Sequence, residues 1–400
     1  MWALALFALT VFFIPPLSAS PEGDGPPSVM FWNLENFFDW RNDSTGVSDA
    51  EFSSRGERRW TRKRFLAKSN AIAKTILWTA SESGSLPDVV GFAEVENGFV
   101  LRRLLQTASL RKLDYKAVHF DSPDPRGIDV ALLYRSSALE LVDARPCHIY
   151  TEQGTVLPTR DILLVRLRRR GDGEDFAVLV NHHPSKYGGA AVSGPKREAA
   201  VRRLRSLVDS LQEAGVRRII ATGDFNDTPG NPVYTLLEPA LVNLAEPVSR
   251  KGQGSIRYNG QWELIDMFFV SPPLAECRPR MTVLHVPFLE TPDRAHGGVK
   301  PFRTYVSNRT VRSFHAKMHL WERRCLDHRL TDAEVDTLVQ VINSYLGYFS
   351  HFKTFRIRKE MFSRSPLKRY VIFSGGWRKC EPFVRPRHII PLERDPALFD

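Results

Sequence analysis

The sequence lacks the motifs of several common enzyme classes. No glycine-rich loop ending in Lys-Ser or Lys-Thr is present, so nucleotide-driven phosphotransfer has no support. No Gly-x-Ser-x-Gly turn precedes a helix, which removes the usual nucleophile of an α/β-hydrolase. Cysteines are few, and their spacing fits no zinc site, although they could form disulfides in an oxidising compartment; they are Cys147, Cys277, Cys325 and Cys380.

A strong excess of one charge is also missing from most of the chain. Residues 1–305 hold 38 basic and 35 acidic side chains, a net of +3, whereas residues 306–400 hold 18 and 10, a net of +8. The basic character that favours nucleic-acid binding therefore belongs mainly to the last quarter. With 42% apolar and 25% charged residues, the 400-residue chain has the composition of a soluble globular protein.

Long hydrophobic runs are absent except at the start. Residues 1–20 read "MWALALFALTVFFIPPLSAS", an apolar run closed by small residues, which predicts a secretory signal peptide. The run is too short to span a bilayer comfortably. The predicted location is therefore secreted or periplasmic. Because no Lys or Arg precedes the run, an uncleaved membrane anchor is the alternative.

Strands and helices alternate from residue 28 to about 290. Helical spacing of apolar residues predicts a helix over 61–80, and proline and glycine punctuation predicts another over 195–215. The strands are also joined by hairpin-like connections. This pattern favours a mixed sheet or a pair of sheets over a pure βαβ series.

Polar side chains recur where predicted strands end. An isolated Asp or Asn after a strand is usually a turn residue. Five strands ending in carboxylate, amide or imidazole are a different matter, because such side chains can converge on one edge of a sheet. The residues are Asn33, Glu94, His182, Asp224 with Asn226, and Asp266.

Carboxylates and amides suit a hard divalent cation such as Mg²⁺ or Mn²⁺. His182 and His183 form a poor chelating pair, because neighbours on a strand point to opposite faces. The chemistry left by these residues is metal-assisted attack of water on a phosphate ester.

Six segments, taken in order, resemble the endonuclease/exonuclease/phosphatase superfamily, the group that includes deoxyribonuclease I. They read "FWNLENFFD", "PDVVGFAEVEN", "RGIDVALLYR", "VNHHPSKYGG", "TGDFNDTPGN" and "ELIDMFFVS". The resemblance implies an α/β fold, a four-layer α/β/β/α sandwich of two mixed sheets, over residues 21–305. It also implies a phosphoric ester hydrolase that requires Mg²⁺ or Mn²⁺.

The resemblance further implies a role for each strand-end residue. Glu94 would bind the metal, and Asn33 would support metal and phosphate. Asp224 would orient or deprotonate the attacking water, and Asn226 would position the nucleophile and a phosphoryl oxygen. His182 would donate a hydrogen bond to the phosphate.

Three further residues are placed at the same site by the motifs. Arg126 and Lys186 are candidate phosphate contacts, and each could equally be a solvated charge. His183 is expected to line the rim or cap the turn.

The family pattern breaks at its last motif. Asp266 should hydrogen-bond a histidine from a final Ser-Asp-His sequence, which would fix that histidine's tautomer and charge. No such motif follows residue 305; His315 and the pair Asp327-His328 are the two candidate replacements. The family's last strand is missing as well, which predicts an open sheet edge.

Residues 306–400 are predicted to form a mainly helical, basic appendage. Part of it, "INSYLGYFSHFKTFRIRKEM", resembles the C-terminal region of reverse transcriptases of mobile elements, which suggests a fusion fragment. Its basic and aromatic residues could contact nucleic acid, or they could form a solvated surface.

Three functions remain open from the sequence. The first is an exported, Mg²⁺-dependent phosphodiester hydrolase of the endonuclease type, acting on nucleic acid through an Asp-oriented water. The second keeps the chemistry but takes a phospholipid or sugar phosphate. The third is an inactive truncated relative whose tail binds nucleic acid.

Overall fold

The computed structural model describes residues 10–14, 27–43, 46–186 and 189–302. The strands are β1 (Thr10–Ile14), β2 (Val29–Phe37), β3 (Val89–Val95), β4 (Tyr115–His119), β5 (Asp129–Arg135), β6 (Leu139–Cys147), β7 (Ile162–Arg169), β8 (Asp175–His182), β9 (Ile219–Asp224), β10 (Val242–Asn243), β11 (Ile256–Tyr258), β12 (Gln261–Glu263), β13 (Asp266–Val270), β14 (Arg280–Leu284), β15 (Glu290–Pro292) and β16 (Val299–Pro301). The α-helices are α1 (Val47–Glu51), α2 (Arg62–Ser83), α3 (Gly98–Leu105), α4 (Ala190–Glu213), α5 (Glu246–Ser249) and α6 (Pro272–Glu276).

Most strands belong to two six-stranded sheets. The first has the order β14-β1-β2-β3-β5-β4, and the second has the order β10-β13-β9-β8-β7-β6. Both are mixed, since β2 is parallel to β3 and β8 is parallel to β9, whereas the other neighbours are antiparallel. The predicted pair of mixed sheets is thereby confirmed.

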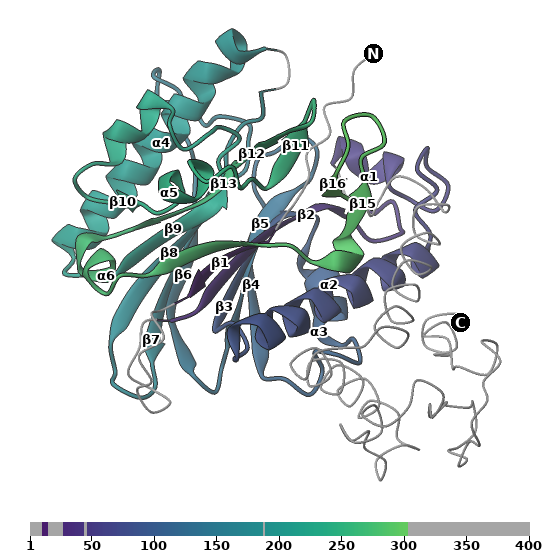
Figure 1. The fold of residues 1–400 in the computed structure, drawn as a ribbon, viewed down its shortest axis with the longest axis horizontal. Coiled ribbons are helices and arrows are strands. Elements are labelled where there is room, and N and C mark those ends of the chain that lie inside the picture. Colours follow the sequence, from purple (N-terminus) through teal and green to yellow (C-terminus); the bar gives the residue numbers. More distant parts are fainter. Residues whose placement is uncertain (1–9, 15–26, 44–45, 187–188, 303–400) are drawn as a thin grey trace.

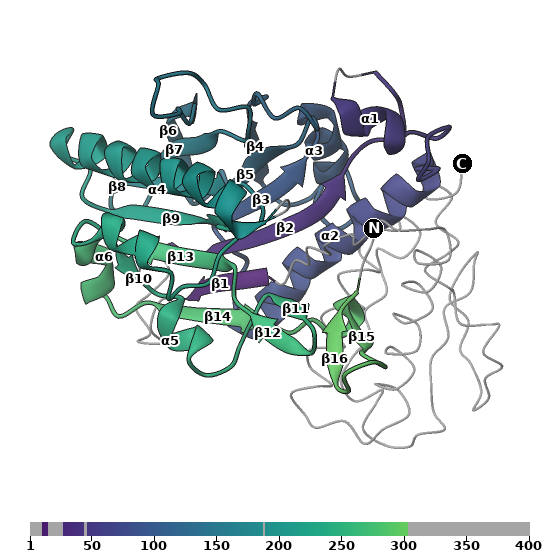
Figure 2. The same ribbon diagram turned by 90° about the horizontal axis from the view of Figure 1, so that it is seen from above.

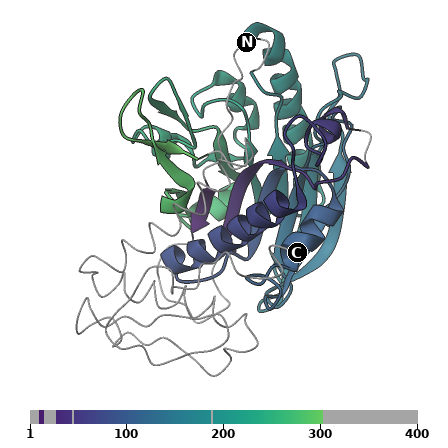
Figure 3. The ribbon, with the colours of Figure 1, turned by 90° about the vertical axis from the view of Figure 1, so that its right-hand side faces the viewer.

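Helices cover the outer faces of the two sheets (Figures 1 and 2). One hydrophobic cluster joins the outer face of the first sheet to α2, through residues such as Phe92, Phe65 and Ile76. The other fills the space between the sheets and continues to α4, through residues such as Phe31 and Leu204. The view in Figure 3 shows α2 lying along its sheet. The four-layer α/β/β/α sandwich is confirmed.

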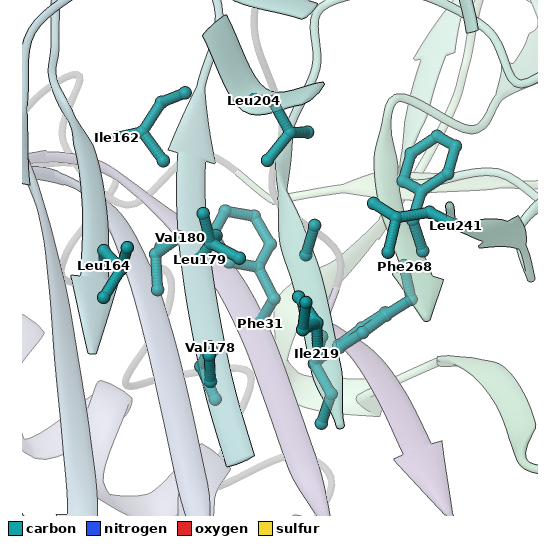
Figure 4. Packing of buried hydrophobic residues seen from close by; sticks show 14 of the residues in the cluster. Phe31, Ile162, Leu164, Val178, Leu179, Val180, Leu204, Ile219, Leu241 and Phe268 are labelled. Atoms are coloured by element: carbon teal, nitrogen blue, oxygen red, sulfur yellow. The ribbon is translucent and has the colours of Figure 1, made fainter. Parts of the chain in front are cut away.

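The sheets approach closely near the middle strands. Figure 4 shows Phe31 of β2 in the same layer as Val178 and Val180 of β8. A Cβ on Gly91 of β3 would lie 3.2 Å from the Phe31 ring and 3.5 Å from Val180. The glycine therefore leaves room for the aromatic ring between the sheets.

The N-terminal apolar segment contributes a strand. Residues Thr10–Ile14, which lie within the predicted signal peptide, form β1 and pair with both β2 and β14. Thus β1 takes the position between two strands that would otherwise lack a neighbour there. Among the helices that the structure describes, none is long and apolar enough to cross a membrane.

Some details of the prediction differ from the structure, and others lie outside the described residues. Helix α4 begins at Ala190, so Pro195 lies inside the helix instead of opening it. Cys147 is a buried thiol and Cys277 an exposed one. The predicted appendage of residues 306–400, its resemblance to reverse transcriptases, and the other two cysteines lie outside the described residues.

Candidate active site

A bulge in β2 places Asn33 beside Glu94. Between the pairs Asn33–Ala93 and Phe37–Val95, three residues of β2 oppose the single residue Glu94 of β3. The Glu94 carboxylate accepts the backbone N–H of Asn36 at 2.8 Å and the Asn33 amide at 3.4 Å. Glu94 is 4% exposed, so these contacts hold a nearly buried carboxylate in one orientation.

Asp224 ends β9 on the other sheet and meets the same asparagine. The Asn33 amide donates to Asp224 Oδ2 at 3.0 Å, and the backbone N–H of Asn226 donates to Oδ1 at 2.9 Å. Burial raises the pKa of Asp224 to about 7; these hydrogen bonds oppose the shift, and the charge of Glu94 adds to it. Without a metal, Asp224 therefore keeps its proton to a higher pH than an ordinary aspartate does.

The two histidines at the end of β8 have different surroundings. His182 Nε2 lies 3.9 Å from Asp224 Oδ2, and within the described chain its Nδ1 has no hydrogen-bond partner. Burial, with the charges of Arg160 and Arg126, lowers the pKa of His182 well below its usual value. The imidazole ring is therefore neutral, and its Nδ1 can still form a hydrogen bond.

His183 is not at the rim, where it was expected. It is 1% exposed, and its ring meets that of Phe225 edge-on with centroids 4.7 Å apart. Only its backbone has a turn role, since its carbonyl accepts the Asn226 amide at 2.9 Å. The reason is that the strand alternation turns its ring into the core behind the site.

Arg160 is a site residue that the sequence reasoning missed. It is 5% exposed and donates to Asp124 Oδ2 at 2.9 Å and to the His183 carbonyl at 2.5 Å. Its Nε atom is buried without a partner among the described residues. Its charge lowers the pKa of Asp224, so a cation lies close to that carboxyl. The sequence feature that could have indicated Arg160 is the Arg-Asp pair directly before the strand that begins at Ile162.

Asp266 lies opposite Asp224 in the sheet, as the first residue of β13. It is fully buried, and in the part of the chain that the structure describes neither carboxyl oxygen accepts a hydrogen bond. Burial and the nearby charge of Asp224 raise the pKa of Asp266 well above its ordinary value. His315 and Asp327-His328, the candidate partners, lie outside the described residues.

Arg126 and Lys186, the candidate phosphate contacts, are both partly exposed and paired with acids. Lys186 Nζ lies 3.1 Å from Asp227 Oδ1, and Arg126 Nε lies 3.4 Å from Asp124 Oδ1. Since Arg126 also lowers the pKa of His182, its charge acts on the site. Contact of either residue with a phosphate stays a prediction.

The donor atoms of the site fit a hard divalent cation. Glu94, Asp224 and Asp266 are buried carboxyl groups, and the charge of Glu94 raises the pKa of both aspartates. A cation bound at Glu94 would relieve that repulsion. The groups of three whose ligand atoms all lie within 4.8 Å of one another are elsewhere in the described chain; they are Asp39, Asp43 and Glu96, and His119, Asp121 and Asp129. Arg41 already pairs with Asp39 at 2.6 Å and with Asp43 at 2.9 Å.

A comparison with family models identifies the class of protein. Residues 28–318 match the model of the endonuclease/exonuclease/phosphatase family. This chain belongs to that family, whose members are phosphoric ester hydrolases. The match includes His315 and ends before Asp327.

Individual relatives are more distant. Nocturnin of Drosophila melanogaster is 28% identical over 170 residues, which are 40% of this chain and 24% of that protein. This chain thus spans about a quarter of that relative's length. The human Nocturnin catalytic domain with bound sulfate anion is 20% identical, with a TM-score of 0.45, over 65% of this chain and 84% of that one. A mannosyl-6-phosphatase of Bacteroides thetaiotaomicron is 17% identical, with a TM-score of 0.39, over 59% and 84%. At these identities, the similarity to these proteins carries no information about the substrate of this chain.

Proposed function

We propose that this protein is a divalent-metal-dependent phosphodiester hydrolase that cleaves nucleic acid by attack of a water oriented by Asp224. The observation that carries the proposal is the meeting of both sheets at one buried cluster. There, a single asparagine, Asn33, bridges Glu94 and Asp224. Family membership supports the reaction class.

Asp224 acts as the general base in this proposal. Burial raises the pKa of Asp224 above the ordinary value of an aspartate, which makes its carboxylate a stronger base towards the attacking water. Asn33 and the Asn226 backbone fix the two carboxyl oxygens, which sets the direction in which the proton leaves the water.

The metal would be held by Glu94 with support from Asn33, as Mg²⁺ or Mn²⁺. When bound, it would offset the negative charge that builds on the phosphoryl oxygens. His182 and Arg160 would donate hydrogen bonds to the same phosphate, because each has a buried nitrogen without a partner in the described chain. Fixed donors of this kind need no reorganisation during the reaction.

Nucleic acid is the substrate that the charge distribution favours. The chain carries a net charge of +11, of which +8 lies in residues 306–400. Arg126 and Lys186 are partly exposed cations of the described part of the chain, although each is paired with an aspartate. Because phosphate backbones attract such surfaces, we propose that the tail increases the affinity for nucleic acid.

A plasmid-nicking assay tests the proposal with the full chain. We expect nicking with Mg²⁺, none with EDTA, and a loss of about 10²–10⁴-fold in Asp224→Asn. Asp143→Asn is the matched control, because Asp143 is exposed on β6, lies outside both acidic clusters and undergoes the same carboxyl-to-amide change. Nicking that survives in Asp224→Asn would contradict the assigned base. Cleavage of a sugar phosphate or phospholipid without nicking would assign that class of ester as the substrate in place of nucleic acid. No hydrolysis at all would favour an inactive relative.

A further inference from the structure

A buried lysine lies beside the bulge that holds Glu94. Lys68 extends from α2 and is only 4% exposed. Its ammonium donates to the backbone carbonyl of Glu35 and, at 3.4 Å, to that of Asn36. The Trp60 ring lies 5.6 Å from the same nitrogen, which adds a cation–π contact. The positive charge is thus placed on two carbonyls of the bulge.

The bulge has a backbone that needs support. Glu35, Asn36 and Glu94 have φ of 53°, 58° and 60°, the left-handed region that residues with a Cβ avoid. Such conformations persist only where the surrounding structure holds them in place. Asn33 holds one side of the bulge, since its Oδ1 accepts the Glu35 N–H at 2.9 Å. Lys68 holds the carbonyl side.

One peptide group connects Lys68 to Glu94. The Glu35 carbonyl and the Asn36 N–H belong to the same planar unit, and in a trans peptide they point in opposite directions. Lys68 binds the oxygen of this unit, and Glu94 Oε2 accepts its N–H at 2.8 Å. A cation on the oxygen polarises the peptide and strengthens the N–H as a donor.

We propose that Lys68 is a positioning residue: it fixes the Glu35–Asn36 peptide, which in turn holds the Glu94 carboxylate ready to bind the divalent cation. This inference rests on the proposed metal-dependent function. Burial lowers the pKa of Lys68 to about 8, and the charges of Glu35 and Glu94 oppose the shift, so the ammonium stays mostly protonated at pH 7. A methionine in its place would keep the volume but lose both the charge and the donors.

The full-length chain can be tested by Mn²⁺ titration followed by electron paramagnetic resonance. We expect Lys68→Met to raise the dissociation constant of Mn²⁺ by about 10–100-fold, as loss of a residue supporting a metal ligand usually does. In nicking assays, kcat should fall while KM for the plasmid stays within about twofold, since Lys68 does not touch substrate. Ser69→Ala is the matched control, because Ser69 is the next residue of α2, fully buried, and bonds only within the helix.

A rescue experiment separates positioning from simple charge balance. In Asn36→Gly, the new residue adopts the positive φ of this position without strain, and the backbone N–H that Glu94 accepts is kept. We expect Lys68→Met/Asn36→Gly to recover Mn²⁺ affinity to within about threefold of the wild type. If Lys68 only offset the charge of the carboxylates, glycine would restore nothing, and that result would overturn the proposal.

The remaining outcomes are also decisive. Folded Lys68→Met with unchanged Mn²⁺ affinity overturns the proposal. If that variant does not fold, Lys68→Gln replaces it: the amide retains a donor without the charge, so Mn²⁺ affinity within about threefold of the wild type supports positioning, and a loss of about 10-fold or more, as charge balance alone would give, overturns the proposal. A wild type that binds Mn²⁺ but cleaves no phosphate ester contradicts the proposed function and leaves the affinity comparison valid. A wild type that binds no Mn²⁺ overturns both.

Discussion

At the scale of single residues, burial controls the charges of the site more than direct contacts do. Asp224, Asp266 and His182 all have pKa values displaced towards the neutral form, with burial as the largest cause. The hydrogen bonds from Asn33 and Asn226 only reduce the shift at Asp224. In the metal-free protein the cluster therefore keeps some of its protons, and metal binding would release them.

The Asp224 carboxyl predicts a pH-dependent stability. Its pKa is 3.8 in an ordinary setting and about 7 when folded, so the folded protein holds a proton that the unfolded chain has already lost. The free energy of unfolding that depends on this group falls as pH rises from about 4 to about 7. Asp224→Asn has no such proton. Its stability relative to the wild type should rise across that window, measured by urea unfolding in EDTA; a constant difference would refute this.

Asp266 predicts a loss of activity without a loss of stability. Burial and the charge of Asp224 raise the pKa of Asp266 well above its ordinary value, so its charge is costly to bury, and Asp266→Asn, which carries none, should change the free energy of unfolding by less than about 1 kcal/mol. We expect kcat to fall by about 10²-fold, because an amide cannot stabilise a protonated histidine. Full activity would mean that no histidine depends on Asp266.

The partner of Asp266 can be found by the same assay. His315 lies inside the span that matches the family, whereas His328 lies beyond it. We therefore expect His315→Ala to match the loss in Asp266→Asn, and the double variant to lose no more than either single one. His328→Ala is the comparison, and the same behaviour there would exchange the two assignments.

The sequence predicted the residues that end strands but not those that support them. Asn33, Glu94 and Asp224 follow apolar runs, and the ends of neighbouring strands meet at one edge. Arg160 comes before a strand, and Lys68 lies on a helix face with ordinary basic neighbours. Their burial depends on packing between distant segments, which no local pattern reveals.

At the scale of elements, the close pairing of β8 and β9 depends on one glycine. Gly223 has φ of 155°, and a Cβ there would lie 2.1 Å from the backbone oxygen of Asn181. Gly223→Ala should therefore destabilise the protein by about 3 kcal/mol or more and displace Asp224. Gly230→Ala is the control, because its Cβ would meet nothing within 4 Å. Thermal unfolding of both variants tests this, and equal melting temperatures would contradict it.

The sheets were predictable and one strand was not. Alternating apolar runs indicated the two mixed sheets, because buried strands and hairpin connections leave a local pattern. The same rules assigned residues 1–20 to a signal peptide, since composition alone does not show where an apolar segment packs. The structure has β1 between β2 and β14, a position that no local pattern indicated.

At the scale of the whole molecule, the N-terminal segment has two roles that conflict. As a signal peptide, the segment would be cleaved from the mature protein, which we propose is exported. As β1, it pairs with five residues of β14 and with three of β2. Removal of residues 1–20 would leave ladder groups on β2 and β14 without partners, at about 1 kcal/mol for each hydrogen bond. We therefore expect a chain of residues 21–400 to unfold at a lower temperature than the full chain.

Thermal unfolding of both chains, together with the mass of the product exported by a secreting host, separates the roles. A lower melting temperature for residues 21–400 and an exported product that keeps its first residues would support β1 as a permanent strand. Equal melting temperatures and a shortened product would support a cleaved signal peptide. Phe12→Pro in the full chain is a second probe, because proline removes an N–H from a strand paired on both sides. It should lower the melting temperature only if β1 is part of the folded sheet.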